Sequence, residues 1–240
     1  MKLYRDEGIV LRTHKLGEAD RIITLLTPMN GKVRAVAKGV RRTKSRFGAR
    51  LEPYSHVDCQ FYRGRTLDIV TQVESLHAYG DPISAHYERY RAGGVLLETA
   101  DKLVVEEGEP NPHLYFLLHG AVASLARGEH RPGLVAGAFL MRALALEGFE
   151  VALLECAVCS APGPHLWFSI PAGGAVCPTC RPPGAGSPSR EAILLMDDLL
   201  SGDWDRADDL PQAVRHEARR LIADYAQWHL ERKIRSLSLL

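Results

Sequence analysis

The sequence predicts a multidomain α+β protein, in which a small β-barrel precedes an α-helical domain. Residues 1–80 contain short runs of β-branched and aromatic residues, separated by turn residues. Residues 81–240 show helical spacing of apolar residues, interrupted once by a segment rich in Gly, Pro and Cys. At 240 residues and 46% hydrophobic content, the chain is long enough to bury the cores of two domains.

Five strands are expected in the first 80 residues. Asn30-Gly31 favours a tight hairpin between the second and third of them. Five strands with no long helix between them fit a small closed barrel, and the OB-fold is the five-stranded barrel most used for nucleic acid. An SH3-like barrel is the alternative. The expected strands are residues 7–14, 21–27, 32–40, 56–62 and 67–76.

Helices are expected from residue 84 onward. Ser84 is the expected N-cap of the first helix, Gly128 ends the second, and Pro132 opens the third. His113 and His119 are expected at a helix surface or hydrogen-bonded in the core, not as ligands. The domains are then 1–80 and 81–240, the second interrupted at about 153–188. The expected helices are residues 84–106, 111–127, 132–147, 190–200 and 211–237.

A run of cations marks the end of the third strand and the loop after it. No acid lies between Asp20 and Glu52, and charge runs of one sign favour a polyanionic partner over the alternative of a solvated face. The first 80 residues carry fifteen Lys and Arg against eight Asp and Glu, and the rest carry fifteen against twenty-one. The candidate phosphate contacts are Lys32, Arg34, Lys38, Arg41, Arg42, Lys44, Arg46 and Arg50.

Aromatic residues near these cations are candidates for stacking on bases. Phe47, between Arg46 and Gly48 in the loop, is expected to be exposed and is the preferred candidate. Phe61 and Tyr62 are neighbours in a strand, so one of them must point into the core.

Two CxxC pairs give the most specific signal in the sequence. Cys156-Ala-Val-Cys159 and Cys177-Pro-Thr-Cys180 are separated by seventeen residues, a spacing typical of a four-cysteine zinc site. Twelve of the twenty-eight residues from 161 to 188 are Gly or Pro, so the metal is expected to hold this segment together. A redox dithiol and a metal-free loop are the alternatives, and Cys59 is expected to be a buried thiol.

Enzymatic motifs are missing from the sequence. Walker A, HExxH, GxSxG and GxGxxG do not occur, and the adjacent acids Glu106-Glu107 and Asp197-Asp198 do not share a helix face. Four cysteines would also leave no open position on a zinc ion. No apolar run approaches the roughly 18 residues needed to span a bilayer, and the start MKLYRDEG has no apolar signal core. A non-enzymatic, cytoplasmic protein without membrane contact is expected.

Taken together, these stretches resemble the bacterial RecO family. The resemblance covers EGIVLRTHKLGEADRIITLLTPMNGKVRAVAKGVRR at the start, LETADKLVVEEGEPNPHLYFLL in the helical part, the two CxxC pairs, and DYAQWHLERKIRS near the end. It implies an N-terminal OB-fold, a helical domain and, in many members, a zinc-binding insert.

The resemblance also implies a function and partners. Members of this family are non-enzymatic recombination mediators of the RecFOR pathway. They bind single-stranded DNA (ssDNA) and double-stranded DNA (dsDNA), anneal complementary strands, associate with RecR and with the single-stranded-DNA-binding protein SSB, and help load RecA onto SSB-coated DNA. The resemblance also implies that the protein lies in the cytoplasm, associated with the nucleoid.

On this chain the DNA role falls on the eight cations above, and the zinc role on Cys156, Cys159, Cys177 and Cys180. Two other functions remain open: an interaction scaffold whose basic loop binds an acidic protein tail, and a zinc-dependent nuclease or hydrolase.

Overall fold

The computed structural model describes residues 2–230 and 233–239. The chain divides into two compact units, Met1–Gly128 and Glu129–Leu240. The expected boundary near residue 80 marks the end of the barrel, but the three helices that follow belong to the same compact unit, and the two longer ones contact the barrel. In the described part of the chain, none of the helices is both long and apolar enough to cross a membrane.

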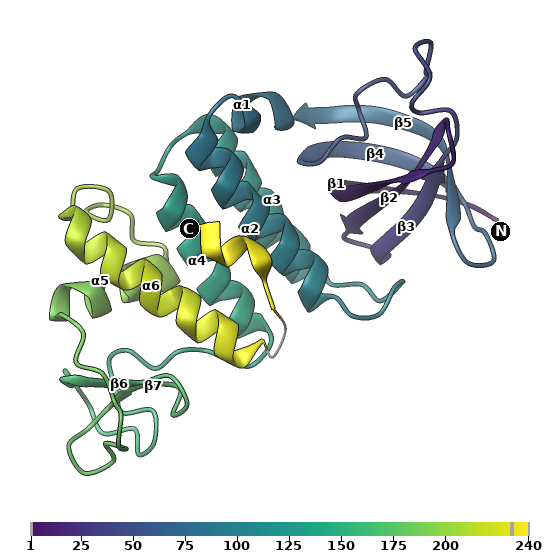
Figure 1. Cartoon of the computed structure of the whole chain (residues 1–240). Helices are drawn as coiled ribbons and strands as arrows, with labels where there is room; N and C mark the ends of the chain where they lie inside the picture. The colour runs from purple at the N-terminus through teal and green to yellow at the C-terminus, as the bar shows by residue number, and fades with distance from the viewer. Residues whose placement is uncertain (1, 231–232, 240) are drawn as a thin grey trace. The chain divides into compact units, whose positions relative to one another are not determined.

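The first unit begins with a closed five-stranded barrel in the order β1-β2-β3-β5-β4 (Figure 1). Neighbouring strands are antiparallel, except β3 and β5, which are parallel. This order is that of an OB-fold, so the predicted fold is confirmed. The strands are β1 (Leu3–Leu16), β2 (Asp20–Thr27), β3 (Gly31–Ala37), β4 (Ser55–Tyr62) and β5 (Asp68–Ala78).

The predicted hairpin joins β2 and β3. Thr27 pairs with Gly31, and Gly31 has a φ of +57°, which only glycine adopts without strain. The main-chain N–H groups of Met29 and Asn30 donate to Oδ2 of Asp6 in β1, at 3.2 and 3.0 Å. A Cβ at Gly31 would lie 1.8 Å from the main-chain oxygen of Glu109, so glycine is also required by the close approach of the chain after the second helix.

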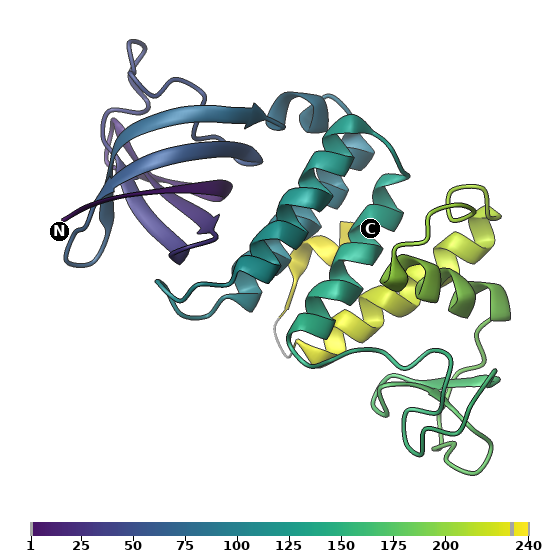
Figure 2. The ribbon, with the colours of Figure 1, turned by 180° about the vertical axis from the view of Figure 1, so that it is seen from behind.

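Three helices follow the barrel in the first unit. They are α1 (Gly80–Ser84), α2 (Tyr87–Leu103) and α3 (Pro112–Arg127). The expected helix over 84–106 is present as α2 but is shorter at both ends, because the main chain is extended at His86 and at Val104. Ser84 is not an N-cap, since its hydroxyl donates to the main-chain oxygen of Asp81. The two longer helices, α2 and α3, run side by side next to the barrel (Figure 2).

Helix α3 begins and ends where the sequence indicated. Oδ1 of Asn111 accepts the N–H of Leu114 at 3.1 Å, Pro112 occupies the first turn, and Gly128 ends the helix in the left-handed conformation. The cap therefore satisfies one of the N–H groups that a helix start leaves unpaired.

The second unit packs three helices around one core. Helix α4 (Pro132–Leu146) contacts α5 (Arg190–Ser201) and α6 (Gln212–His229). The expected helix over 211–237 is too long: α6 ends at His229, residues 231–232 lie outside the described residues, and Arg235–Leu239 form a 3₁₀ helix. A segment of short strands, β6 (Trp167–Ser169) and β7 (Gly174–Val176), separates α4 from α5, as the Gly- and Pro-rich composition indicated.

Candidate nucleic-acid interface and metal centre

The basic loop is defined here as residues 38–54, which connect β3 to β4 (Figure 1). Its first part is fixed to the turn between β1 and β2. The N–H of Gly39 donates to Oδ1 of Asp20 at 2.7 Å, and the N–H of Arg41 donates to the main-chain oxygen of Ala19 at 3.0 Å. The Arg41 guanidinium also donates to the main-chain oxygens of Gly17 and Glu18.

The second part of the basic loop is fixed by apolar side chains that enter the barrel core. Val40, Phe47 and Leu51 pack with barrel residues such as Val10 and Phe61. The Phe47 ring is 1% exposed, so the expectation that it is an exposed ring for stacking is wrong. The physical reason is the free energy of burying a large apolar ring, which outweighs the preference of a charged loop for water.

Six cations of the basic loop remain exposed, and residues 38–51 contain no carboxylate. The nearest acid in the sequence, Glu52, is already paired with Arg21 of β2. The loop therefore presents a concentrated positive charge on a fixed main chain, which is the arrangement that attracts phosphates. The exposed cations are Lys38, Arg41, Arg42, Lys44, Arg46 and Arg50.

Lys32 does not belong to this surface. Its ammonium group is buried against the end of α2, where it donates to the main-chain oxygens of Asp101, at 2.9 Å, and of Val104. A cation at a helix C-terminus is stabilised by carbonyl groups that lack partners within the helix. The assignment of Lys32 as a phosphate contact is therefore corrected to a structural role.

Arg34 occupies an intermediate position. Its guanidinium lies 3.1 Å from a carboxylate oxygen of Glu107, in the segment after α2, and both side chains are partly exposed. The charge of Arg34 is partly neutralised by this ion pair, whereas the six cations of the basic loop lie in a stretch without acids.

Two arginines that the sequence analysis did not single out line a cleft together with Arg34. Arg63 and Arg65 belong to the connection between β4 and β5, and with Tyr4 and Arg34 they line a cleft of about 230 Å³. The Arg63 guanidinium lies 4.8 Å from the centre of the Tyr4 ring. The signal was the Arg-Gly-Arg sequence directly after a strand.

The two neighbouring aromatic residues at the end of β4, Phe61 and Tyr62, point to opposite faces of the strand. Phe61 is completely buried in the barrel, whereas Tyr62 is 37% exposed and has the Lys2 ammonium 5.9 Å from its ring centre. Tyr62 is thus the exposed ring of the pair, and it lies directly before Arg63.

The metal centre is built from two CxxC turns. In the first turn the N–H of Ser160 donates to the main-chain oxygen of Cys156, and in the second the N–H of Cys180 donates to that of Cys177. Strand β7 ends at Val176, so it delivers Cys177 directly to the site.

A further pair of contacts fixes the first turn beside β7. The N–H of Ala157 donates to the main-chain oxygen of Ala175 at 2.8 Å. Ala152 pairs with Gly174, and a Cβ at Gly174 would lie 2.1 Å from the main-chain oxygen of Ala152. Glycine at this position therefore permits the close approach that brings the two turns together.

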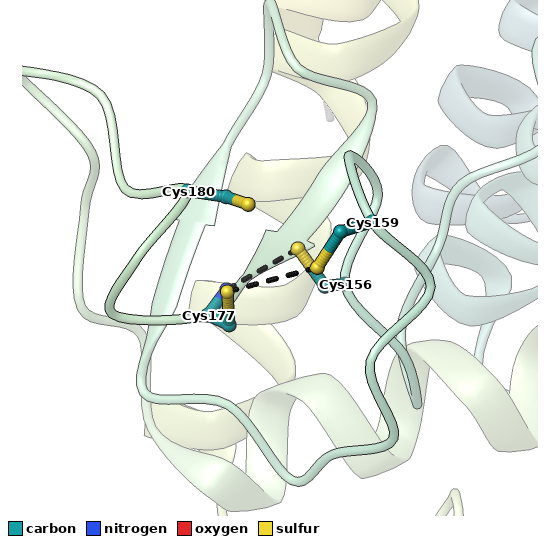
Figure 3. A group of neighbouring side chains, drawn as sticks. All are labelled: Cys156, Cys159, Cys177 and Cys180. Carbon is teal, nitrogen blue, oxygen red and sulfur yellow. Dashed lines mark hydrogen bonds between the residues drawn. The ribbon is translucent and has the colours of Figure 1, made fainter.

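All four sulfur atoms lie within 4.8 Å of one another (Figure 3). The Sγ atoms of Cys159 and Cys177 are 3.9 Å apart. Two thiolates on a tetrahedral zinc ion, at about 2.3 Å from it, are about 3.8 Å apart. The four cysteines that the sequence singled out are therefore brought together, at separations that a metal ion could bridge.

The surroundings of Cys156 favour the deprotonated, thiolate form of its side chain. The main-chain N–H of Cys177 donates to Sγ of Cys156, and this hydrogen bond lowers the pKa of the Cys156 thiol to about 6. The neighbouring thiols of Cys159 and Cys177 raise the pKa of Cys180. Four thiolates this close together repel one another, and a divalent cation would compensate their negative charge. The donor set therefore fits a soft or borderline metal.

The fold and the two sites define an OB-fold protein with an exposed basic loop and a helical domain that carries a cluster of four cysteines able to hold a metal ion. The sequence matches the family described as Recombination protein O N terminal over residues 1–79, and the one described as Recombination protein O C terminal over residues 84–238. The chain belongs to the RecO family of DNA repair proteins.

Curated relatives are similar to the chain over its full length. The DNA repair protein RecO of Thermobifida fusca is 56% identical over 239 residues, which cover 100% of this chain and 98% of that protein. The RecO of Streptomyces avermitilis is 54% identical over 243 residues, covering 99% and 98%. The RecO of Frankia casuarinae is 54% identical over 240 residues, covering 100% and 99%.

Proposed function

We propose that the chain binds ssDNA and dsDNA through the basic loop, with little dependence on base sequence. The observation that carries this proposal is the set of six exposed cations between Lys38 and Arg50, on a stretch of main chain without a carboxylate. Each phosphate that a cation neutralises releases counterions from the DNA, so binding weakens as salt is added. Arg63 and Arg65, in the connection between β4 and β5 of the same barrel, are further proposed phosphate contacts.

The proposed annealing of complementary strands depends on the same positive charge of the basic loop. Two complementary strands repel one another through their phosphates, and a cationic surface that neutralises both lowers this repulsion while the bases remain free to pair.

The nine DNA-binding positions assigned from the sequence are reduced to seven in this proposal, since Lys32 and Phe47 are buried. Arg34 contributes only after its ion pair with Glu107 opens.

Membership in a family of DNA repair proteins supports a role as a recombination mediator. In this proposal the chain associates with RecR and with SSB, and with RecR it helps load RecA onto SSB-coated ssDNA. The protein then works in the cytoplasm, at the nucleoid. The helical unit from Glu129 onward is the proposed location of partner contacts, because the basic loop lies in the other unit.

The proposed metal is one structural zinc ion held by the four cysteines. Four thiolates fill a tetrahedral shell, so no position is left for a water nucleophile. The donor set supports a non-enzymatic protein, in which the metal holds the Gly- and Pro-rich segment together.

A salt titration of DNA binding tests the proposed interface. The full chain is compared with a variant in which Arg41, Arg42, Lys44 and Arg46 are all changed to Ala. A matched control removes four exposed cations of the second unit, with Arg181, Arg190, Arg220 and Lys233 changed to Ala. Fluorescence anisotropy with labelled ssDNA and dsDNA gives the slope of log affinity against log salt.

In the loop variant the slope is expected to become less steep by about 3 on either form of DNA, because each lost phosphate contact reduces its magnitude by about 0.7 to 0.9. The control variant, which has the same net charge, should keep the slope of the unmodified chain. A folded loop variant with an unchanged slope would reject the basic loop as the DNA site.

A further inference from the structure

Three histidines from three different elements meet in the first unit, outside the sites described above. His56 lies in β4, His77 in β5 and His119 in α3, and one ring nitrogen of each histidine lies within 4.8 Å of those of the other two. The Nδ1 atoms of His56 and His77 are 3.1 Å apart, and the His56 and His119 ring centres are 4.3 Å apart. Two imidazoles on a tetrahedral zinc ion place their nitrogens about 3.3 Å apart.

The hydrogen bonds around His56 determine which of its nitrogens is free. The Tyr115 hydroxyl donates its single proton to Oε1 of Glu7 at 3.0 Å, and a carboxylate can only accept. The Tyr115 oxygen, 3.0 Å from Nε2 of His56, must therefore accept a hydrogen bond from Nε2–H. Neutral His56 then has an unprotonated Nδ1, and its lone pair faces His77.

This arrangement is typical of a histidine that binds metal. Such a histidine donates its second ring N–H to an oxygen, which fixes the tautomer and the orientation of the ring. Here the series His56, Tyr115, Glu7 supplies that support, and both His56 and Tyr115 are at least nine-tenths buried. Nε2 of His119 lies 3.2 Å from the Tyr79 hydroxyl, and this contact holds the orientation of the His119 ring.

Burial favours the metal-binding form of the two less exposed histidines of the cluster. Burial and the neighbouring histidines lower the pKa of His56 to about 4, and burial lowers that of His119. Neutral imidazole, the form that binds metal, is therefore favoured at neutral pH. His77 is exposed, so an ion and a water ligand can reach the cluster from solvent.

We propose that His56, His77 and His119 form a second metal site, selective for zinc-class divalent ions and independent of the four cysteines. Without metal, His77 Nδ1–H donates to Nδ1 of His56. On binding, the ion takes the place of this shared proton, which moves to Nε2 of His77, and water fills the fourth position. The bound ion would join β4, β5 and α3. Contrary to the sequence expectation, His119 is then a ligand.

Zinc stoichiometry on the full chain tests the proposal. Protein already holding one equivalent at the cysteines is dialysed at pH 7.5 against zinc-buffered solution, and bound zinc is measured by elemental analysis. The unmodified chain is expected to hold two equivalents, and His77→Gln and His119→Gln one. The matched control is His113→Gln, which changes an exposed histidine of the same helix and should keep two.

A second variant separates metal binding from a merely structural cluster. Tyr115→Phe keeps the buried ring but removes the acceptor for Nε2–H of His56, so the affinity for the second zinc should fall about 10- to 100-fold. The proposal is overturned if the unmodified chain holds one equivalent, if the His77→Gln variant still holds two, or if the His113→Gln control loses as much zinc as the cluster variants.

Discussion

The ammonium nitrogen of Lys32 lies 2.9 Å from the main-chain oxygen of Asp101, in the last turn of α2. The same nitrogen also donates to the main-chain oxygen of Val104, and Oδ2 of Asp101 lies 3.1 Å from Nε of Arg12 in β1. A strand lysine therefore joins the barrel to the end of a helix within the first unit. This role separates Lys32 from the cations that follow it in the sequence.

Lys32→Ala is expected to lower the free energy of unfolding by about 1–3 kcal/mol, because it leaves buried carbonyl oxygens without a donor. The salt slope of DNA binding should not change. Lys38→Ala is the matched control: its side chain is exposed, so stability should stay within about 0.5 kcal/mol while the salt slope falls by about 0.7 to 0.9. Urea unfolding and anisotropy measure the two quantities, and a reversed pattern would contradict the assignment.

Phe47→Ala is expected to lower the free energy of unfolding by about 3–5 kcal/mol, since it empties a fully buried position in the barrel core. Phe47→Leu should recover most of this loss and bind DNA with the affinity of the unmodified chain. Phe116→Ala, at a phenylalanine that is 62% exposed, serves as the control and should change stability little. Weak DNA binding by a stable Phe47→Leu protein would instead indicate that the ring stacks on a base.

Removal of the proposed zinc ion from the cysteine site is expected to unfold the segment from about 153 to 188 and leave the barrel folded. The segment contains few apolar residues that can form a core without the ion. Limited proteolysis followed by mass spectrometry should show new cleavage in this segment after chelation. Cys159→Ser should show the same pattern, whereas Cys59→Ala, in the barrel core, should keep the zinc at Cys156 and its partners.

The histidine cluster predicts a loss of stability in mild acid. His56 has a pKa of about 4 in the folded chain against 6.5 for the free side chain, with burial as the main cause and His119 and His77 as further causes. Between these values the unfolded chain binds more protons, so stability is complete above pH 6.5 and falls as pH drops towards 4. The groups that face His56 are His77, His119, Tyr115 and Glu7.

The slope of unfolding free energy against pH can reach about 1.4 kcal/mol per pH unit for one proton. Urea unfolding in the presence of a chelator, at pH values from 4 to 7, measures this slope. His56→Gln should flatten the curve relative to the unmodified chain, and His113→Gln should not. A curve that is equally steep in His56→Gln would exclude His56 as its source.

Local patterns predicted much of the fold. The turn residues before Gly31 specify the hairpin between β2 and β3, and the two CxxC pairs specify a site whose four sulfurs do meet. Both features depend on residues close in sequence, or on chemistry with few alternatives.

Contacts between residues far apart in the sequence explain where the structure differs from the sequence predictions. The burial of Phe47 depends on space inside the barrel, and that of Lys32 on a helix end about seventy residues further along. The cluster of His56, His77 and His119 brings together residues from three elements, at spacings that match no short motif. Sequence periodicity describes each element by itself and does not identify these neighbours.

The anchoring of the basic loop at Val40, Phe47 and Leu51 has a consequence for the thermodynamics of binding. A disordered basic segment loses main-chain conformational entropy when it meets a polyanion, at about 1–2 kcal/mol per ordered residue. Here the folding of the barrel has already ordered the main chain, so association restricts mainly the long Lys and Arg side chains. More of the favourable free energy of counterion release is then available as affinity.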